Sequence, residues 1–427
     1  DQFTVYIGKY LRTFTAEGRL VSQAEKKKDE LKSCVADLHM EKGKLKKVTV
    51  KKERVRGKVL AVTDNSIELE GYGCVPLDDN FHVYKAYGDF QVLGKGSILV
   101  GYDLQEFVAA DGKLSAAILE QPLDAETIRV LIMDNGFKQI FHDTIELTAN
   151  CDGEMIYEKE NGDHESSSFK KGDTFTFEAT DKKLEKGRMT LKPEDGEGII
   201  VTSLERGQGQ PVYSGSMEVK AEEGGLVLIN ELYLEDYLKK VVPSEMPASY
   251  EEQALMAQAV CARTYAVCQI QENSLEKYGA DVDDSVNYQV YNNFGADKRT
   301  NKAVQDTKGQ ILCQNGEPIT AYYFSTSAGR TSTDEIWGAD RSAAYLKSVE
   351  CDFDQNMPWS SWSVEIPWET LEKRSGNLEG SGKFIGLQVI KKNISGAVTG
   401  MEIVTENKSI QLEGEYEIRQ FLSPAGC

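Results

Sequence analysis

Apolar and polar residues alternate in short stretches along most of the chain, which predicts many strands and one strongly helical region. Two apolar runs, 59–62 and 67–69, flank Asp64 and Asn65, and this is the pattern of a β-hairpin. Further strands are expected at 82–84, 97–100, 127–132, 198–201 and 226–229. The polar stretches 158–168 and 181–187 are expected to be exposed loops between strands.

The helical region is clearest at 250–272. Apolar and small residues recur there every three or four positions, at Leu255, Ala259, Ala262, Ala266 and Ile270. The small side chains allow close backbone approach, so this helix is expected at the centre of its domain. Ser249 followed by Glu252 has the spacing of a capping box at the start of a helix. Shorter helices are predicted at 231–242 and 298–310.

The first 55 residues have no clean period, and one interpretation is a helix between residues 20 and 40. The length of 427 residues allows two to four domains at roughly 100–200 residues each. We predict a basic, partly helical segment at 1–55, a small β-rich module at 56–125 and a larger domain at 126–427. The fold class is expected to be α+β, mostly β, with the 250–272 helix central to the last domain.

Charge is unevenly distributed. The net charge is −20, but residues 1–60 hold 16 Lys or Arg against 8 Asp or Glu, which leaves −28 for the remainder. An acidic body argues against nucleic-acid binding, which depends on clustered cations. The basic run that includes Lys26, Lys27 and Lys28 could face anionic lipid or a wall polymer, although a solvated face is the commoner explanation for such a run.

The sequence lacks the residues that several kinds of catalysis and metal binding require. All four histidines precede residue 165, and HExxH, P-loop and dinucleotide glycine motifs are absent from the sequence. The eight cysteines form no CxxC pair, so neither a zinc finger nor a disulfide framework can be inferred from their spacing. Any catalysis is therefore expected to use carboxylates, hydroxyls, amides and Arg, with no cofactor and no metal.

Glu245 is the best candidate for such chemistry. It lies between Pro243 and Pro247, just before the predicted helix, and the two prolines favour a stiff extended linker. A carboxyl held there among Val and Met side chains would be partly desolvated, which raises its pKa toward the value that a general acid needs. From spacing alone, a solvated Glu in a helix-entry loop is the commoner explanation of the segment.

Four blocks in order resemble the SpoIID/LytB family, named after stage II sporulation protein D. The blocks are 230–238, 241–267, 284–291 and 322–331, the last leading to 336–338 and 345–349. The resemblance covers roughly residues 127–427. It identifies 126–427 as a SpoIID/LytB-like domain with a catalytic core at about 230–352, and its C-terminal end can be incomplete because relatives continue into a closing strand beyond Gly426 and Cys427.

The resemblance implies cleavage of peptidoglycan glycan strands by a lytic transglycosylase, a lyase, in sporulation or cell-wall remodelling. Glu245 would be the single catalytic residue. Most glycosidases need two carboxylates, but a lytic transglycosylase needs one, because the sugar's own 6-hydroxyl attacks its anomeric carbon and forms a 1,6-anhydro product. The alternative is a non-catalytic LytB-like protein that binds glycan and acts as an amidase enhancer.

Further residues in these blocks are candidates for substrate binding, since amides, hydroxyls and aromatic rings suit sugars, although each could be an ordinary structural residue. They are Gln258, Arg263, Gln289, Tyr291, Tyr323, Ser325, Ser327 and Thr331. Arg263 is expected to pair with a carboxylate other than Glu245, or with a backbone carbonyl. Gln258 either orients Glu245 or bonds within the core. The four late tryptophans are expected in the core.

The sequence also departs from the family. Some relatives carry a zinc-binding His/Cys cluster, but residues 268–313 contain no His, so no metal is predicted. Ala328 stands where relatives often have Gly or Cys. The expected partners are glycan strands and a wall amidase. The expected location is the cell envelope outside the cytoplasm, and any leader or membrane anchor would lie outside this sequence, which has no apolar run of 18 residues.

Overall fold

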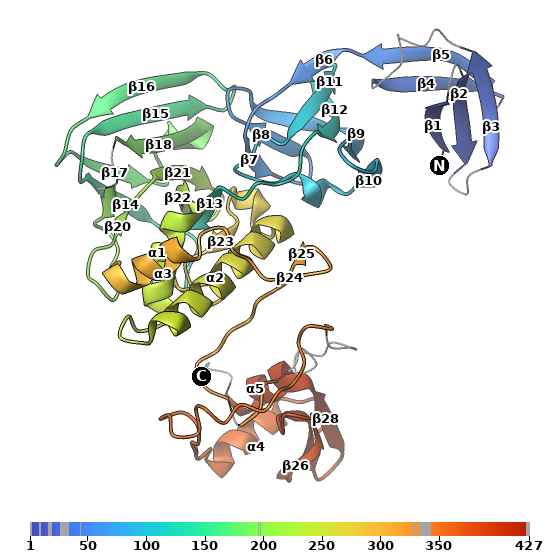
Figure 1. Ribbon diagram of the computed structural model, residues 1–427. Helices are drawn as coiled ribbons and strands as arrows, with labels where there is room; N and C mark the ends of the chain where they lie inside the picture. The colour runs from blue at the N-terminus through green and yellow to red at the C-terminus, as the bar shows by residue number, and fades with distance from the viewer. Residues whose placement is uncertain are drawn as a thin grey trace. The chain divides into compact units, whose positions relative to one another are not determined.

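The structure is a computed structural model that describes residues 2–7, 10–15, 19–25, 34–42, 44–194, 196, 198–327, 329–332 and 343–423. Internal contacts divide the chain into two units, residues 1–313 and 314–427, and each is described by itself (Figure 1). Four features discussed above lie outside the described residues: the Lys26–Lys28 run, Ala328, the 336–338 part of the fourth block, and the chain end at 426–427.

The N-terminal segment is strand where it is described. β1 (Gln2–Ile7), β2 (Tyr10–Thr15) and β3 (Leu20–Glu25) form one antiparallel sheet, and β4 (Val35–Glu41) pairs with β5 (Lys44–Lys51). The predicted helix at 20–40 is therefore wrong, because both of its ends are strands.

The next strands form the small β-rich module. They are β6 (Glu53–Val55), β7 (Val59–Val62), β8 (Ser66–Leu69), β9 (Gly73–Lys85), β10 (Gln91–Leu93), β11 (Gln105–Ala110) and β12 (Lys113–Leu119), in the order β6-β11-β12-β9-β8-β7 with β10 on β9. The predicted hairpin is confirmed as β7–β8. The strand predicted at 97–100 is wrong: η1 (Lys95–Ser97) is a 3-10 turn, and Ile98 and Val100 are buried without strand pairing.

Two further sheets follow in the first unit. One comprises β13 (Thr127–Leu131), β15 (Gly153–Lys159), β16 (His164–Phe169), β18 (Gly187–Pro193), β21 (Ser216–Glu222), β22 (Gly225–Tyr233) and β23 (Val282–Asp283), in the order β16-β15-β18-β21-β22-β13-β23. The other has β14 (Thr144–Ala149), β17 (Thr174–Glu178), β19 (Ile199–Val201) and β20 (Val212–Tyr213), in the order β17-β14-β19-β20. The loop predicted at 158–168 is wrong in its second half, which is β16, whereas 181–187 is a turn containing η2 (Leu184–Lys186).

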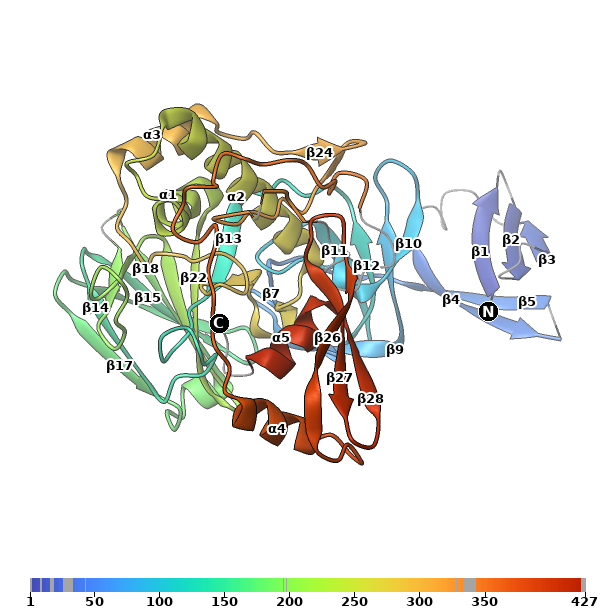
Figure 2. The same cartoon turned by 90° about the horizontal axis from the view of Figure 1, so that it is seen from below.

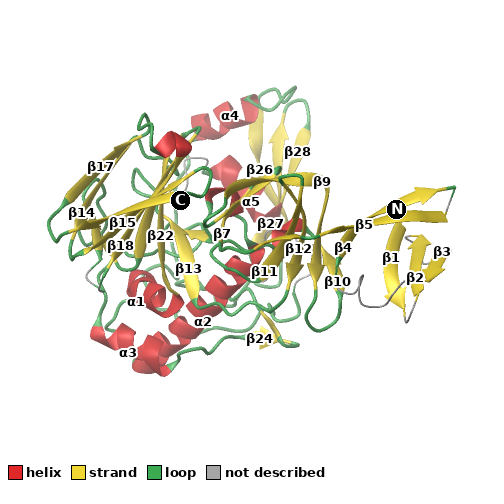
Figure 3. Cartoon of the chain, turned by 90° about the horizontal axis from the view of Figure 1, so that it is seen from above, coloured by secondary structure: helices red, strands yellow, loops and turns green. Residues whose placement is uncertain are grey.

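The helices α1 (Leu234–Glu245), α2 (Glu252–Glu272) and α3 (Lys298–Asp306) pack together beside β13 and β22, and η3 (Glu276–Tyr278) follows α2 (Figures 1 and 3). The predicted apolar stripe is confirmed, since Leu255, Ala259, Ala262, Ala266 and Ile270 are fully buried. The capping box is wrong. The N-cap is Glu251, without a side-chain bond, because Tyr250 N–H bonds to Pro247 O and leaves Ser249 in a turn before the helix.

The second unit begins with the short β24 (Cys313–Gln314) and β25 (Glu317–Pro318) at its boundary. It contains β26 (Phe384–Lys392), β27 (Val398–Thr405) and β28 (Ser409–Glu413), with α4 (Trp368–Gly376) and α5 (Gly414–Leu422) around a small core (Figure 2). Trp359, Trp362 and Trp368 are at least half exposed, so their expected place in the core is wrong, and Trp337 lies outside the described residues. The α+β, mostly β fold class is confirmed, and the predicted domain boundaries stay a prediction.

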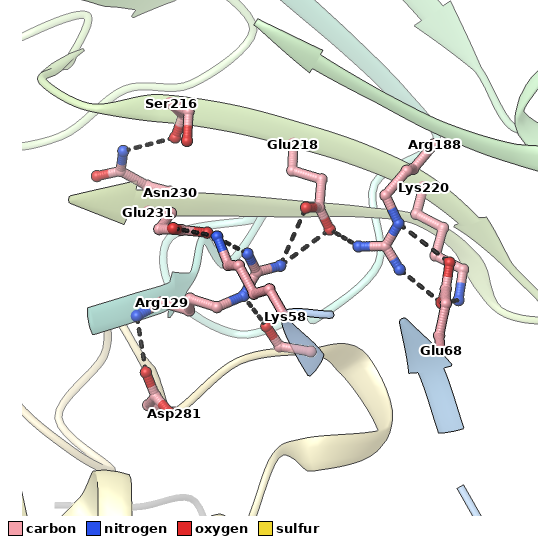
Figure 4. Close-up of polar contacts among 11 residues, drawn as sticks. Lys58, Glu68, Arg129, Arg188, Ser216, Glu218, Lys220, Asn230, Glu231 and Asp281 are labelled. Carbon is pink, nitrogen blue, oxygen red and sulfur yellow. Dashed lines mark hydrogen bonds and ion pairs between the residues drawn. The ribbon is translucent and has the colours of Figure 1, made fainter. Parts of the chain in front are cut away.

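Buried charges stiffen the main sheet. Arg129 on β13 and Arg188 on β18 are almost completely buried and share the buried carboxylate of Glu218 on β21 (Figure 4). Arg129 Nη2 lies 3.0 Å from both Glu218 oxygens. Burial opposes ionisation of Glu218, but the two guanidinium groups outweigh it and lower its pKa to about 2. The three strands are therefore held together by one buried carboxylate and its two guanidinium partners.

The same network attaches the β-rich module to the sheet. Lys58, just before β7, pairs with Glu231 on β22, which also binds Arg129. Glu68 on β8 accepts from Arg188 Nε at 3.1 Å (Figure 4). Arg129 and Arg188 thus both bind Glu218 of the sheet. Arg188 also binds Glu68 of the module directly, and Arg129 is connected to Lys58 of the module through Glu231. The module and the sheet are joined by an interface with paired charges in its interior.

We predict that Glu218→Gln lowers the free energy of unfolding by about 3–5 kcal/mol at pH 7, because two buried guanidinium groups lose their carboxylate. The lowered pKa stabilises the native state fully above the ordinary value of 4.5, and this contribution is lost as pH falls from 4.5 toward about 2. The difference between wild type and variant, measured by urea unfolding, should therefore shrink between pH 7 and pH 3.

Glu222→Gln is the matched control on the same strand, since Glu222 is partly exposed and pairs only with the solvent-accessible Lys220 among the described residues. It should cost less than about 1 kcal/mol. Equal costs for the two variants would show that the buried network does not stabilise the sheet.

Candidate active site

Glu245 lies in the last turn of α1 and not in an extended linker, so the linker prediction is wrong. Pro243 is inside the helix, and Met246 N–H closes its end on Val242 O. A proline in a helix loses one backbone hydrogen bond. Val241 and Val242 are completely buried, and their packing holds this turn helical in spite of that loss. The carboxyl group is therefore carried by a helix end.

The carboxyl group of Glu245 is half-buried and contacts a neighbouring loop, residues 284–294. Its Oε1 accepts a hydrogen bond from Val290 N–H at 2.7 Å. A backbone donor is fixed by the course of the chain, so it sets the orientation of the carboxyl plane more firmly than a flexible side chain does. The raised pKa predicted for Glu245 stays a prediction.

Ser244 holds the other end of the same loop. Its Oγ accepts from Asn293 N–H and Phe294 N–H, both at 3.2 Å, and donates to Lys240 O at 2.7 Å. Ser244 and Glu245 together give the last turn of α1 three hydrogen bonds to backbone N–H groups of the 284–294 loop. The end of α1 and the loop are therefore held together by these three hydrogen bonds.

A buried polar contact lies beneath this loop. Tyr291 is fully buried, and its hydroxyl donates to Asn230 Oδ1 at 2.7 Å. Asn230 in turn donates to Ser214 O at 2.8 Å and Ser216 O at 3.1 Å. Figure 4 shows Asn230 directed toward Ser216, while its neighbour Glu231 reaches Arg129. The substrate-binding role predicted for Tyr291 stays a prediction, and in this structure its side chain is enclosed under the loop.

Gln289 is buried in the same way. Its Oε1 accepts from Tyr237 OH on α1 at 3.2 Å, and its Nε2 donates to Ala262 O on α2 at 3.3 Å. The rings of Tyr237 and Tyr291 pack with centroids 4.9 Å apart. The substrate-binding role predicted for Gln289 also stays a prediction. The side chain joins the loop to both helices.

Arg263 on α2 binds Glu235 on α1 with two hydrogen bonds, Nε to Oε1 at 2.8 Å and Nη2 to Oε2 at 2.9 Å. It also donates to the carbonyls of Val304 and Gln310, each at 3.2 Å. The prediction that its partner is a carboxylate other than Glu245 is confirmed. Its predicted role in substrate binding stays a prediction, and in this structure the guanidinium is buried and joins the three helices.

Gln258, also on α2, is 8% exposed, and its amide nitrogen has no hydrogen-bond partner among the described residues. Its predicted role in orienting Glu245 stays a prediction. Two cavities of the first unit, of about 370 and 620 Å³, lie between the β-rich module and the main sheet and are lined by other residues. The open glycan groove at Glu245 also stays a prediction.

The other candidates belong to the second unit. Ser327 is buried and its Oγ donates to Asp354 Oδ1 at 3.1 Å. Its predicted sugar contact stays a prediction. Thr331 Oγ1 accepts from Val349 N–H at 3.0 Å within a local backbone pairing. Ser325 is exposed and Tyr323 half-exposed. Groove membership of Tyr323, Ser325 and Thr331 stays a prediction.

Three contributors to the site were missed by sequence reasoning. Val290 acts through its backbone, which leaves no signal in the sequence. Ser244 was passed over beside the more conspicuous Glu245. Asn230 follows the apolar run 226–229 inside β22 and could have been found, because a polar side chain within a buried strand needs an internal partner.

No group of three or more His, Cys, Asp or Glu residues within the part of the chain that the structure describes could hold a metal ion. Within the same residues, every helix is too short or too polar to span a bilayer.

Comparisons with known proteins agree with the resemblance seen in the sequence. The family model described as Stage II sporulation protein matches residues 222–313, which include α1, α2, α3 and the 284–294 loop. The amidase enhancer of Bacillus subtilis is 39% identical over 142 residues, 33% of this chain and 18% of that protein. Stage II sporulation protein D is 35% identical over 176 residues in Bacillus subtilis, 37% of this chain and 51% of that protein.

Stage II sporulation protein D of Bacillus amyloliquefaciens is 37% identical over 144 residues, 30% of this chain and 42% of that protein. The chain thus spans about half the length, or less, of these relatives. The SpoIID resemblance is confirmed by the family model and these relatives.

We predict that Ser244→Ala loosens the 284–294 loop and leaves the fold intact. Two backbone N–H groups lose their acceptor, so hydrogen exchange at Asn293 and Phe294 should become faster, and the free energy of unfolding should fall by about 1 kcal/mol. Ser249→Ala is the matched control, since Ser249 is exposed and does not cap α2. Unchanged exchange in Ser244→Ala would contradict the contact described above.

Proposed function

We propose, on the premise that residues 222–313 are a SpoIID family segment, that this protein cleaves the glycan strands of peptidoglycan as a lytic transglycosylase. The observation that supports this proposal is the position of Glu245. Its carboxyl is half-buried at a helix end and is oriented by Val290 N–H. A general acid needs such a fixed position, because proton transfer depends on geometry before it depends on acidity.

The proposed reaction uses one carboxyl group twice. Glu245 first donates its proton to the glycosidic oxygen, and the bond from that oxygen to the anomeric carbon breaks. The carboxylate then accepts the proton of the same sugar's 6-hydroxyl, whose oxygen bonds to the anomeric carbon and closes the 1,6-anhydro ring. Glu245 is thereby restored to its acid form. No water is consumed, so a second carboxylate to activate one is unnecessary.

The surroundings of Glu245 suit this double role. Ser244 and Val290 fix the helix end against the loop, so the carboxyl needs little rearrangement between its two proton transfers. The place of action that we propose is the cell envelope outside the cytoplasm, during sporulation or wall remodelling, with glycan strands and a wall amidase as partners.

A second candidate function is favoured by the similarity to the Bacillus subtilis amidase enhancer. In that case the protein would bind glycan without cleaving it, and would increase the activity of a separate wall amidase. The same helix end and loop could serve either function.

We expect Glu245→Gln to reduce the rate of 1,6-anhydro product formation from purified glycan strands by about 100-fold or more, because the general acid is lost. The amide oxygen of Gln can still accept from Val290 N–H, so the unfolding midpoint should not change. Glu251→Gln is the control: Glu251 is exposed and its side chain makes no capping bond. Mass spectrometry of the products measures both rates, and an undiminished rate in Glu245→Gln would refute the proposal.

The transglycosylase and enhancer functions are distinguished by incubating the wild-type protein with glycan strands, first alone and then together with a wall amidase. A transglycosylase releases anhydro products alone. An enhancer releases nothing alone and accelerates the release of peptides by the amidase.

A further inference from the structure

We propose that the turn at residues 206–209, named here the clamp turn, positions Glu245 by fixing both ends of the 284–294 loop. This inference rests on the proposed function of Glu245 and deepens it. The clamp turn lies outside the matched family segment, and its residues follow no motif in the sequence. It is closed by reciprocal backbone hydrogen bonds between Arg206 and Gly209, each at 2.9 Å.

The first end of the loop is fixed by Arg206. Arg206 is buried, and its Nη2 donates to Asp284 Oδ2 at 2.7 Å and to Met133 O at 2.6 Å. Asp284 is completely buried and accepts from Met133 N–H at 2.8 Å through its other oxygen. The guanidinium also lies over the ring of Phe137, 4.1 Å from its centroid. A buried ion pair with these additional bonds holds the start of the loop in one place.

The second end is fixed by the rest of the turn. Gln208 Nε2 donates to the backbone O of Asn292 at 2.7 Å and to its Oδ1 at 2.9 Å. Gly207 N–H donates to Asn293 Oδ1 at 2.7 Å. Asn292 has a φ of 56°, a left-handed conformation that Asn tolerates better than most residues. Gln208 therefore binds the residue at which the loop adopts this left-handed conformation.

Gly207 determines how closely the turn approaches the loop. A Cβ at this position would lie 2.8 Å from Asn293 O and 3.0 Å from Asn293 Oδ1. That is closer than such atoms pack, so any larger residue would push the loop away from the turn. Steric contact at Gly207 thus prevents the turn and the loop from coming closer, and the hydrogen bonds of Gly207 and Gln208 prevent them from moving apart.

Val290 lies between these two fixed ends, and its N–H is the donor that orients Glu245. Asn293 also binds Ser244 in the last turn of α1. The clamp turn, the loop and the helix end therefore form a continuous chain of contacts from Arg206 and Gln208 to the carboxyl group. Loss of the Gln208 hydrogen bonds should therefore displace Val290 N–H and, with it, the carboxyl group of Glu245.

The test uses changes at Gln208 that alter hydrogen bonding without opening a core. Gln208→Glu keeps the size of the side chain but removes its donor and places a negative charge beside two acceptor oxygens of Asn292. Gln208→Lys restores a donor at the end of a longer side chain. Gln210→Glu is the matched control, because exposed Gln210 makes the same kind of bond to Thr202 O, at 3.1 Å, away from the loop.

With purified glycan strands, kcat of Gln208→Glu should fall about tenfold while KM and the unfolding midpoint stay unchanged. The alkaline limb of its pH–activity profile should move to higher pH, because a carboxylate that loses an N–H donor keeps its proton to a higher pH. Hydrogen exchange at Val290 should become faster. Gln208→Lys should recover most of kcat, and Gln210→Glu should match wild type. A turn that merely stabilised the fold would change the unfolding midpoint and leave the pH profile alone.

The outcomes separate the inference from the function on which it rests. Wild-type kcat and an unchanged pH profile in Gln208→Glu, with Glu245→Gln inactive, would overturn the clamp and leave the transglycosylase proposal standing. Absence of anhydro product from the wild-type protein would overturn both.

Discussion

A buried polar side chain must find its partner inside the protein, and this constraint organises the first unit around β22. Successive residues on a strand point to opposite faces. Glu231 therefore reaches the ion network that joins the β-rich module to the sheet, while Asn230 binds Tyr291 beneath the 284–294 loop (Figure 4). One strand thus connects the module to the candidate site through two adjacent residues that both need internal partners.

The same constraint explains why several polar residues of the family blocks form internal hydrogen bonds in this structure. Arg263 and Gln289 are enclosed, and each satisfies its donors on neighbouring helices. Their hydrogen bonds cannot be exchanged for bonds to a sugar without leaving a buried group unpaired, which costs about 1–3 kcal/mol. Such residues contribute to the site through rigidity. Glu245 differs from them because its carboxyl is only half-buried.

Residues 222–313, which the family model matches, contribute one set of side chains to this arrangement, and the rest of the chain contributes another. Residues 222–313 supply Glu245, its helix and the loop that donates to it. The ion network and the clamp turn add Arg188, Glu218, Arg206 and Gln208 from residues before 222. The geometry around Glu245 therefore depends also on strands and turns that lie outside residues 222–313.

The sequence by itself determined the features that depend on local pattern. The α+β, mostly β class, the β7–β8 hairpin and the buried stripe of α2 follow from spacing, because hydrophobic periodicity reflects which face of an element is covered. It also supplied Glu245 as the candidate acid through the family resemblance, and a carboxylate partner for Arg263.

Tertiary structure alone decided the rest. Glu245 ends a helix because packing of Val241 and Val242 outweighs the local effect of Pro243, and local propensity cannot weigh such packing. The Val290 donor belongs to the backbone, and the partners Arg206 and Asp284 are 78 residues apart in sequence. No local pattern encodes a contact over that separation, so only the folded chain shows which polar residues can meet a ligand and which hold the site in place.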